Sequence, residues 1–212
     1  MNLHERYRPK NWGEVVGQAD SVATLRRFAG SCWGGRAIWI SGKSGQGKTT
    51  LARIYAAHNA DRWNTTEIDA SEVSLSFLRE VQECYPLRPM TCAGKAYIIN
   101  EAHGLRKDAI RKLLIMLEDI PDYVAWVFTT TTDGMDLFED GQIDAHPLLS
   151  RCNVISLAQR GIMPLFAARA REIACKEGLN GRDLGAYQRL VNDHSGNMRR
   201  VLAEIENGKM KG

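Results

Sequence analysis

An eight-residue glycine-rich segment constrains the fold of this chain more than any other feature. Residues 42–49 read Gly-Lys-Ser-Gly-Gln-Gly-Lys-Thr and fill every fixed position of the phosphate-binding loop pattern G-x-x-x-x-G-K-[S/T]. That loop lies between a buried strand and a helix, and the apolar run 37–40 and the amphipathic stretch 51–58 supply both flanks. The sequence therefore predicts a nucleoside triphosphate site in an α/β fold.

The chemistry of this loop gives its residues distinct roles. Glycines let successive backbone N–H groups turn toward the β- and γ-phosphates, where a Cβ would collide. Lys48 adds a positive charge, and Thr49, at the start of the next helix, offers a hydroxyl to Mg²⁺. The expected nucleotide-binding residues of the loop are Gly42, Gly45, Gln46, Gly47, Lys48, Thr49 and Thr50.

Composition narrows the class of protein. With 212 residues, 44% of them hydrophobic, the chain can bury the core of one domain or of one domain plus a small appendage. No apolar run reaches the ~18 residues of a membrane span, and the first residues have no apolar signal core. Five cysteines without a C-x-x-C pair favour free thiols, so we expect a cytoplasmic protein. The net charge of +3 does not by itself indicate a nucleic-acid binder.

Short apolar runs alternate with amphipathic stretches, a pattern typical of parallel strands joined by crossover helices. We therefore expect a doubly wound parallel sheet. The expected strands are 37–41, 65–69, 95–100, 124–130 and 153–157, and the expected helices are 20–29, 49–59, 73–84 and 106–119. After residue 160 only helical patterns follow, at 164–177, 184–193 and 197–207. The predicted division is an α/β domain at 1–160 and a small all-helical domain at 161–212.

The expected strand 95–100 is followed directly by an acid, Glu101. A phosphate-binding loop of this kind needs such an acid as its partner. Such strand ends normally carry Asp-Glu, in which the Asp holds a magnesium-bound water and the Glu polarises the attacking water. Here Asn100 takes the first position, so it can accept a hydrogen bond but carries no charge, and Mg²⁺ affinity should fall. Glu101 keeps the general-base position. Alternatively, Asn100 is only the polar end of a strand and Glu101 a helix-capping acid.

Six segments together resemble one family of ATPases. In chain order they are E-R-Y-R-P-K (5–10) with V-V-G-Q (15–18), E-I-D-A-S (67–71), N-E-A-H (100–103), L-L-I-M-L-E (113–118), S-R-C (150–152) and G-N-M-R-R-V-L (196–202). In this order they resemble the boxes of AAA+ sliding-clamp loaders, both replication factor C small subunits and the bacterial polymerase III gamma/tau subunit. The resemblance implies an α/β P-loop domain, a helical lid, and an ATP-hydrolysing subunit that loads a sliding clamp onto primer-template DNA.

The resemblance also implies residues around the nucleotide. The adenine is expected to lie among Tyr7, Arg8, Val16 and Gly17. The sensor 1 position, which touches the γ-phosphate or the attacking water, falls on Thr132, with Thr131 as the alternative. The sensor 2 position falls on Arg199, which would reach from the lid onto the phosphates of the same subunit.

Arg151, within S-R-C, resembles the arginine finger of the family. Such a finger enters the nucleotide site of a neighbouring subunit and stabilises charge on the transferring phosphoryl group. The resemblance therefore implies other clamp-loader subunits as partners, in a homo- or hetero-oligomer. The expected catalytic residues are Lys48, Glu101, Thr132 and Arg151. The alternative for Arg151 is a lone surface arginine beside a strand.

A basic stretch falls on the expected helix 106–119. Its cations are Arg106, Lys107, Arg111 and Lys112, which lie partly along one side of the helix. By the resemblance, this face would track phosphates of primer-template DNA in a central chamber. An ordinary solvated helix face is an equal alternative.

Clamp-loader subunits normally carry a third, helical domain that forms a pentameric collar, and this sequence stops at Gly212 without one. We therefore expect either a fragment or a minimal version that assembles weakly. Two other functions stay open. One is an ATP-binding scaffold subunit, in which Asn100 slows hydrolysis and Arg151 serves another subunit. The other is a different AAA+ DNA-remodelling ATPase, such as a branch-migration motor.

Overall fold

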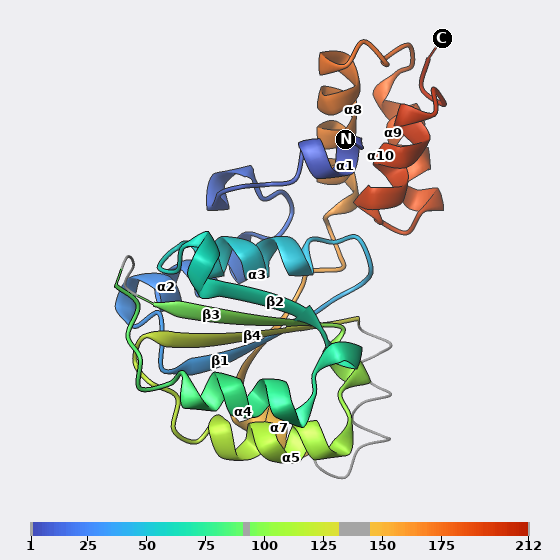
Figure 1. Ribbon diagram of the computed structural model, residues 1–212. Coiled ribbons are helices and arrows are strands. Elements are labelled where there is room, and N and C mark those ends of the chain that lie inside the picture. Colours follow the sequence, from blue (N-terminus) through green and yellow to red (C-terminus); the bar gives the residue numbers. More distant parts are fainter. Residues whose placement is uncertain (1, 91–93, 132–144, 212) are drawn as a thin grey trace.

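The computed structural model describes residues 2–90, 94–131 and 145–211, which contain a five-stranded sheet with helices on both faces (Figure 1). The strands are β1 (Arg36–Ser41), β2 (Thr65–Asp69), β3 (Lys95–Asn100), β4 (Val124–Thr130) and β5 (Cys152–Ser156). Their order is β2-β3-β4-β1-β5, and every pair is parallel. The predicted doubly wound α/β fold is confirmed.

Helices cover both faces of the sheet. On one side lie α2 (Ala19–Ser31) and α3 (Lys48–Ala57), and on the other lie α4 (Leu75–Glu83), α5 (Lys107–Met116) and α7 (Ala145–Ser150) (Figure 1). Single 3₁₀ turns occupy Trp12–Glu14, Arg62–Asn64, Ala70–Glu72 and Ala102–Gly104. No helix in the described ranges is both long and apolar enough to cross a membrane.

The central strands are apolar on both sides because both of their faces are covered. In β1, Trp39 faces the α5 side and stacks on Phe128 of β4, with ring centroids 5.4 Å apart. Its neighbours Ile38 and Ile40 point the other way, into the core beneath α3. Alternation of side chains along a strand thus gives each face its own core.

Three loops meet at the carboxyl edge of the sheet. The glycine-rich loop follows β1, Asn100 ends β3 and Thr130 ends β4. Because β4 pairs with both β1 and β3, the ends of these three strands are neighbours. Ligands of open α/β sheets bind outside such an edge, where the strand order reverses.

The last three helices form a separate apolar cluster with the first one. They are α8 (Met163–Lys176), α9 (Leu184–Asp193) and α10 (Met198–Glu206), and they are joined by α1 (Leu3–Arg6). Leu3 is 2% exposed within this cluster, and the hydroxyl of Tyr7 donates to Glu177 Oε1 over 2.5 Å. The N-terminal arm therefore packs on the helical unit, above the sheet in Figure 1. The domain boundary at residue 160 stays a prediction.

Two stretches of chain link the sheet to the helical unit, one before α2 and one after β5. Gln18 on the first stretch is 1% exposed and bonds the second at Ala158. Its Nε2 donates to the Ala158 carbonyl over 3.2 Å, and the Ala158 N–H donates to its Oε1 over 2.8 Å. The two connections are thus joined side by side.

Candidate nucleotide site

The glycine-rich loop wraps around the ammonium group of Lys48. Gly47, with φ of 101°, precedes α3 in the left-handed conformation that glycine tolerates best. Lys48 Nζ donates to the carbonyl oxygens of Gly42, at 3.0 Å, and Lys43, at 3.2 Å. Burial lowers the pKa of Lys48, an effect that Glu101 opposes and Arg199 reinforces. The loop therefore holds a buried cation within electrostatic reach of both side chains.

Gln46 adds an unused donor to the same loop. Its side chain is 4% exposed, and its Oε1 accepts from the Lys43 N–H over 3.1 Å. Its Nε2 is buried and has no hydrogen-bond partner among the described residues. Buried donors normally find an acceptor. Together with the ammonium of Lys48, this excess of donors fits an anionic ligand such as a chain of phosphates.

Asn100 is the centre of a hydrogen-bond network at the strand ends. Its Oδ1 accepts from the hydroxyl of Thr49, at 3.0 Å, and from that of Thr129, at 2.9 Å. Its Nδ2 donates to Glu67 Oε1 over 2.8 Å. The structure thus brings together Thr49 and Asn100, the two residues predicted to hold the metal, and adds a carboxylate from β2.

Glu67 is ionised by the same network. It accepts two hydrogen bonds from Arg53, at 2.7 and 2.9 Å, besides the one from Asn100. Burial works against ionisation, but the hydrogen bonds from Arg53 and Asn100 outweigh it and lower the pKa of Glu67. The negative charge next to Asn100 therefore comes from Glu67, and Arg53 neutralises it.

Glu101 follows β3 in a conformation that side chains seldom adopt. Its φ of 50° and ψ of 46° lie in the left-handed region, which costs an L-residue roughly 1–2 kcal/mol. Its carboxylate is 47% exposed and lies 3.6 Å from Nδ1 of His103. The backbone thus turns the predicted base out of the strand toward the pocket that it lines.

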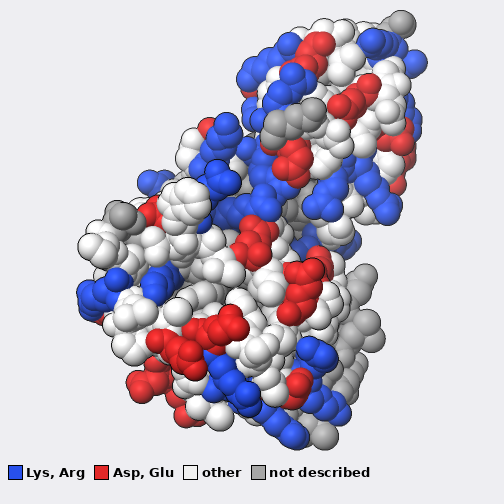
Figure 2. All heavy atoms as spheres, in the orientation of Figure 1, with Lys and Arg blue, Asp and Glu red and all other residues white. Residues whose placement is uncertain are grey.

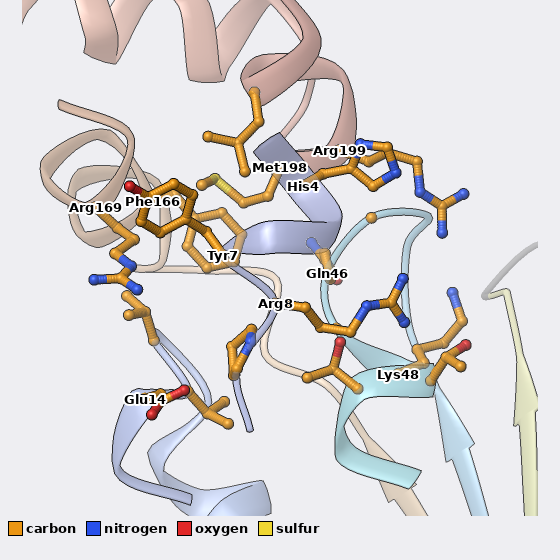
Figure 3. A pocket seen from close by; sticks show the side chains of 18 of the residues that line it. His4, Tyr7, Arg8, Glu14, Gln46, Lys48, Phe166, Arg169, Met198 and Arg199 are labelled. Carbon is orange, nitrogen blue, oxygen red and sulfur yellow. The ribbon is translucent and has the colours of Figure 1, made fainter. Parts of the chain in front are cut away.

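A pocket between the loop, the N-terminal arm and the helical unit holds most of the predicted nucleotide residues (Figure 3). Its lining includes Tyr7, Arg8, Val16, Gly45, Gln46, Gly47, Lys48, Thr49, Thr50, Glu101 and Arg199. In Figure 3 the charged ends of Arg8, Lys48 and Arg199 gather at one end, and Tyr7 and Phe166 lie at the other. The arrangement offers a cationic end for phosphates and, for a base, an end with aromatic rings at which Arg169 and Glu14 also lie.

Two predicted binding residues lie beside the pocket. Gly42 packs under the loop, where an added Cβ would meet Leu157 at 2.9 Å. Gly17, with φ of 76°, lies against α8, and its Cβ would meet Ile162 and Phe166 at 3.1 and 3.2 Å. Gly17 therefore lets the arm approach the helical unit closely, which positions the wall of the pocket.

The helical unit supplies a wall that the sequence did not reveal. The additional lining residues from this unit are Phe166, Arg169, Ile173, Met198 and Leu202. Helical periodicity marks the apolar ones only as candidate core residues, because a core face and a ligand-facing edge have the same spacing. The signal that could have found them is adjacency: Met198 precedes Arg199, and Leu202 lies one turn further on.

The loop also touches the helical unit directly. The Met198 N–H, at the start of α10, donates to the Gly45 carbonyl over 3.3 Å. An added Cβ on Gly45 would lie 2.0 Å from Asn197 Oδ1. Asn197 caps α10 by accepting from the Arg200 N–H, so it cannot withdraw without uncapping the helix. The phosphate-binding loop and α10 are therefore in contact through backbone atoms.

Arg151 lies outside the pocket, where α7 meets β5. Its guanidinium donates to the Pro147 carbonyl, at 2.9 Å, and to Glu118 Oε1, at 2.5 Å. A side chain so placed does not line the pocket of its own chain. Its predicted role as a finger for a second subunit stays a prediction.

The predicted DNA-binding side chains lie on and just before α5. Arg106, Lys107 and Arg111 are exposed, and Lys112 is half-buried. The Arg106 guanidinium donates to the Val73 carbonyl over 3.4 Å, and Lys112 Nζ donates to Gln82. Arg106 and Lys112 are thus engaged within the chain. Thr132, the predicted sensor 1, lies outside the described residues, whereas Thr131 is half-buried just after β4.

The described residues around the loop offer Mg²⁺ few protein ligands. No group of three or more His, Cys, Asp or Glu side chains is placed to hold a metal in the described part of the chain. Mg²⁺ bound by phosphates and waters needs only one or two protein ligands. The hydroxyl of Thr49 and the amide oxygen of Asn100, 3.0 Å apart, supply two oxygens of the required kind.

No protein-family model matches the chain. In sequence it is 30% identical, over 84% of its length, to DNA polymerase III subunit gamma/tau of Mycoplasma pneumoniae. It is also 31% identical, over 93% of its length, to replication factor C small subunit 1 of Pyrobaculum arsenaticum. The chain spans 28% of the first relative and 59% of the second.

In structure the chain resembles RuvB of Thermotoga maritima, a Holliday junction branch migration motor. The TM-score is 0.70, with 94% of this chain and 64% of that chain covered, at 20% sequence identity. At this identity the likeness shows the fold alone.

Proposed function

The chain belongs to the clamp-loader family of AAA+ ATPases, and on this premise we propose that it binds and hydrolyses ATP to load a sliding clamp onto primer-template DNA. One observation carries the proposal. Residues far apart in sequence, Tyr7, Lys48, Glu101 and Arg199, line a single pocket with a cationic end and an apolar end. This is the arrangement that a nucleoside triphosphate requires.

The loop and the helical unit would hold the phosphates. N–H groups of the loop and the ammonium of Lys48 bind the β- and γ-phosphates, and Arg199 approaches them from α10. Figure 2 shows Lys and Arg side chains gathered where the helical unit meets the sheet. A phosphate chain in this place neutralises cations that belong to both units, so ATP would hold the units together.

Glu101 is the proposed general base. Its carboxylate lines the pocket next to the loop, and it would orient and polarise the water that attacks the γ-phosphorus. Thr49 and Asn100 would hold Mg²⁺ that arrives with the nucleotide, and the ion would neutralise charge on the phosphates. Because Asn100 is neutral and Glu67 is paired with Arg53, we expect Mg²⁺ to bind weakly without nucleotide.

The apolar end of the pocket would take the adenine. Val16 and Tyr7 from the arm and Phe166, Met198 and Leu202 from the helical unit form its walls. Flat aromatic bases bind in such apolar slots. Since walls from both sides are needed, base binding favours a closed helical unit.

The proposed partners are other clamp-loader subunits, a sliding clamp and primer-template DNA. Arg151 would enter the nucleotide site of a neighbouring subunit, since it does not line its own. Arg106, Lys107, Arg111 and Lys112 would contact phosphates of DNA. The relatives are named as subunits of larger assemblies, which supports this proposal.

The test is ATP turnover by the full chain, measured with and without primer-template DNA and compared with a Glu101→Gln variant. We expect turnover that rises with protein concentration and with DNA, and that Glu101→Gln lowers at least ~10²-fold while ATP still binds. Binding is measured by titration of a fluorescent ATP analogue. A chain that does not bind the analogue at all would contradict the proposal.

A second function is favoured by one specific observation. The amide of Asn100 is engaged at both ends, by Thr49 and Thr129 on its oxygen and by Glu67 on its nitrogen. A chain with such a neutral site could bind ATP, hydrolyse it slowly and serve as a scaffold that donates Arg151 to another subunit. Tight binding of the analogue without turnover, in the same experiment, would select this function.

A further inference from the structure

One carboxylate binds two consecutive residues of the N-terminal arm. Glu177 lies directly after α8, and its Oε1 accepts from the Tyr7 hydroxyl over 2.5 Å. Its Oε2 accepts from the Arg6 guanidinium, also over 2.5 Å. The Glu177 side chain is 19% exposed, so most of it is shielded from water. Both oxygens of this carboxylate are therefore engaged by the arm.

The backbone holds Glu177 in a fixed place relative to the pocket. Its N–H donates to the Ile173 carbonyl over 3.1 Å, which continues the hydrogen bonding of α8. On the same helix, Phe166 and Ile173 are buried in the apolar cluster of the helical unit and also line the pocket. Glu177 itself is not among the described residues that line the pocket. It thus lies behind a wall that α8 provides.

Tyr7 is attached to the helical unit through both its ring and its hydroxyl. The half-buried ring packs against the apolar cluster of that unit and lines the pocket at the same end as Phe166 (Figure 3). The guanidinium carbon of Arg6 lies 5.7 Å from the centre of this ring. The hydrogen bond to Glu177 raises the pKa of Tyr7, so the hydroxyl keeps its proton and donates.

The start of the arm is attached to the helical unit as well. Leu3 is buried in the same apolar cluster, and its N–H donates to Glu206 Oε2 over 3.4 Å. Contacts with the helical unit therefore fix both ends of α1. The side of the pocket that Tyr7 forms belongs to the helical unit, although Tyr7 lies far from α8 in the sequence.

We infer that Glu177 is a positioning residue for the base of the nucleotide. By binding Tyr7 and Arg6 it orders one aromatic wall of the pocket before the nucleotide arrives. A ligand that meets an ordered wall does not lose affinity by ordering it. Glu177 thus contributes to the affinity for the base and not to the affinity for the phosphates. The inference rests on the proposed function, with the base at the end of the pocket where Tyr7 lies.

Two ligands separate the base from the phosphates in a calorimetric titration. ATP would occupy both ends of the pocket, and inorganic tripolyphosphate only the cationic end. We expect Glu177→Ala to lower the affinity for ATP about fivefold and to leave that for tripolyphosphate unchanged. Tyr7→Phe keeps the ring and removes the hydroxyl, so it should have a similar effect.

The double variant and a matched control complete the test. Glu177→Ala combined with Tyr7→Phe should bind ATP no more weakly than Glu177→Ala alone, because both changes break the same hydrogen bond. Glu204→Ala removes a carboxylate that pairs with Lys209 over 3.0 Å on the same helical unit. This control should bind both ligands as the wild-type protein does.

A purely structural role gives a different result. If Glu177 only supports the fold, Glu177→Ala weakens ATP and tripolyphosphate equally, and this would overturn the inference, as would unchanged affinity for both. Thermal unfolding of each variant measures the effect on the fold separately.

Hydrogen exchange provides a readout that needs no nucleotide. We expect the amides of residues 3–8 to exchange faster in Glu177→Ala and in Tyr7→Phe than in the wild-type protein, and unchanged rates would overturn the inference. Failure of the proposed function looks different. In that case the wild-type protein does not bind ATP, while the exchange rates of the variants still rise.

Discussion

The hydroxyl of Thr49 donates to the amide oxygen of Asn100 over 3.0 Å, which joins the phosphate-binding loop to the end of β3. The other end of the same amide donates to Glu67 on β2 over 2.8 Å. An aspartate at position 100 could accept from Thr49 but could not donate to Glu67. The asparagine is therefore matched to its neighbour, in addition to being a neutral substitute in the metal site.

We predict that Asn100→Asp destabilises the protein at neutral pH without Mg²⁺. The new carboxylate would face the ionised Glu67, which would lose the hydrogen bond from position 100 and keep only those from Arg53, at a cost of about 1–3 kcal/mol. Urea unfolding of the two proteins measures the difference. Adding Glu67→Gln should recover most of the loss, because an amide at position 67 can donate to the aspartate. An Asn100→Asp protein as stable as wild type would contradict this account.

Glu67 should make stability depend on pH below neutrality. Hydrogen bonds from Arg53 and Asn100 lower its pKa in the folded protein below the ordinary value of 4.5. The unfolded chain then binds the proton more readily, so the stabilisation is complete above about 4.5 and is lost as pH falls through the folded-state pKa. Glu67→Gln cannot titrate. The stability gap between wild type and this variant, from urea curves at several pH values, should narrow below 4.5, and a constant gap would refute it.

Gly45→Ala should separate the loop from α10. Its Cβ would lie 2.0 Å from Asn197 Oδ1, in addition to the cost of placing alanine at φ of 74°. Gly178→Ala is a matched control, since Gly178 has φ of 67° and no atom near its added Cβ. Both variants should lose about 1 kcal/mol from backbone strain. Only Gly45→Ala should also lose at least ~10-fold in affinity for an ATP analogue, since only its Cβ disturbs the loop and the α10 contact.

Arg151→Ala tests whether the chain completes the site of a second subunit. Loss of an arginine finger lowers turnover by ~10³-fold or more, whereas binding of ATP to the chain's own pocket should not change. Arg200→Ala, which removes an exposed arginine from α10, serves as the control for lost charge. Turnover is measured over a range of protein concentrations with DNA present. If Arg151→Ala reduced nucleotide affinity as well, the guanidinium would act on its own subunit.

Much of the fold could be predicted because its strands and longer helices have recognisable hydrophobic patterns in the sequence. All five expected strands lie within one residue of the observed ones. The central strands β1, β3 and β4 are the clearest, since each contains an apolar run. The short helices α1 and α7 were not predicted. A helix of 4 residues such as α1 has too few positions to show a period, and it forms because Leu3 packs on the helical unit.

The candidate site was predictable where a motif spans it and not where tertiary contacts build it. Lys48 and Thr49 follow from the loop pattern alone. The bond between Asn100 and Glu67 joins residues 33 positions apart, and it depends on the parallel register of β2 and β3. The apolar wall at Phe166 and Met198 depends on how the helical unit lies over the loop. Neither arrangement leaves a local trace in the sequence.

The paired hydrogen bonds between Gln18 and Ala158 have a mechanical consequence. Two connecting segments that are hydrogen-bonded to each other allow rotation of the helical unit about them, but they oppose twisting and sliding of that unit. We expect the helical unit to move over the sheet with one degree of freedom, so that a single distance between spin labels on the two units would report its whole range. Gln18→Ala would remove both hydrogen bonds between the connecting segments and broaden that distance distribution. Opening and closing of the helical unit would then no longer follow a single rotation.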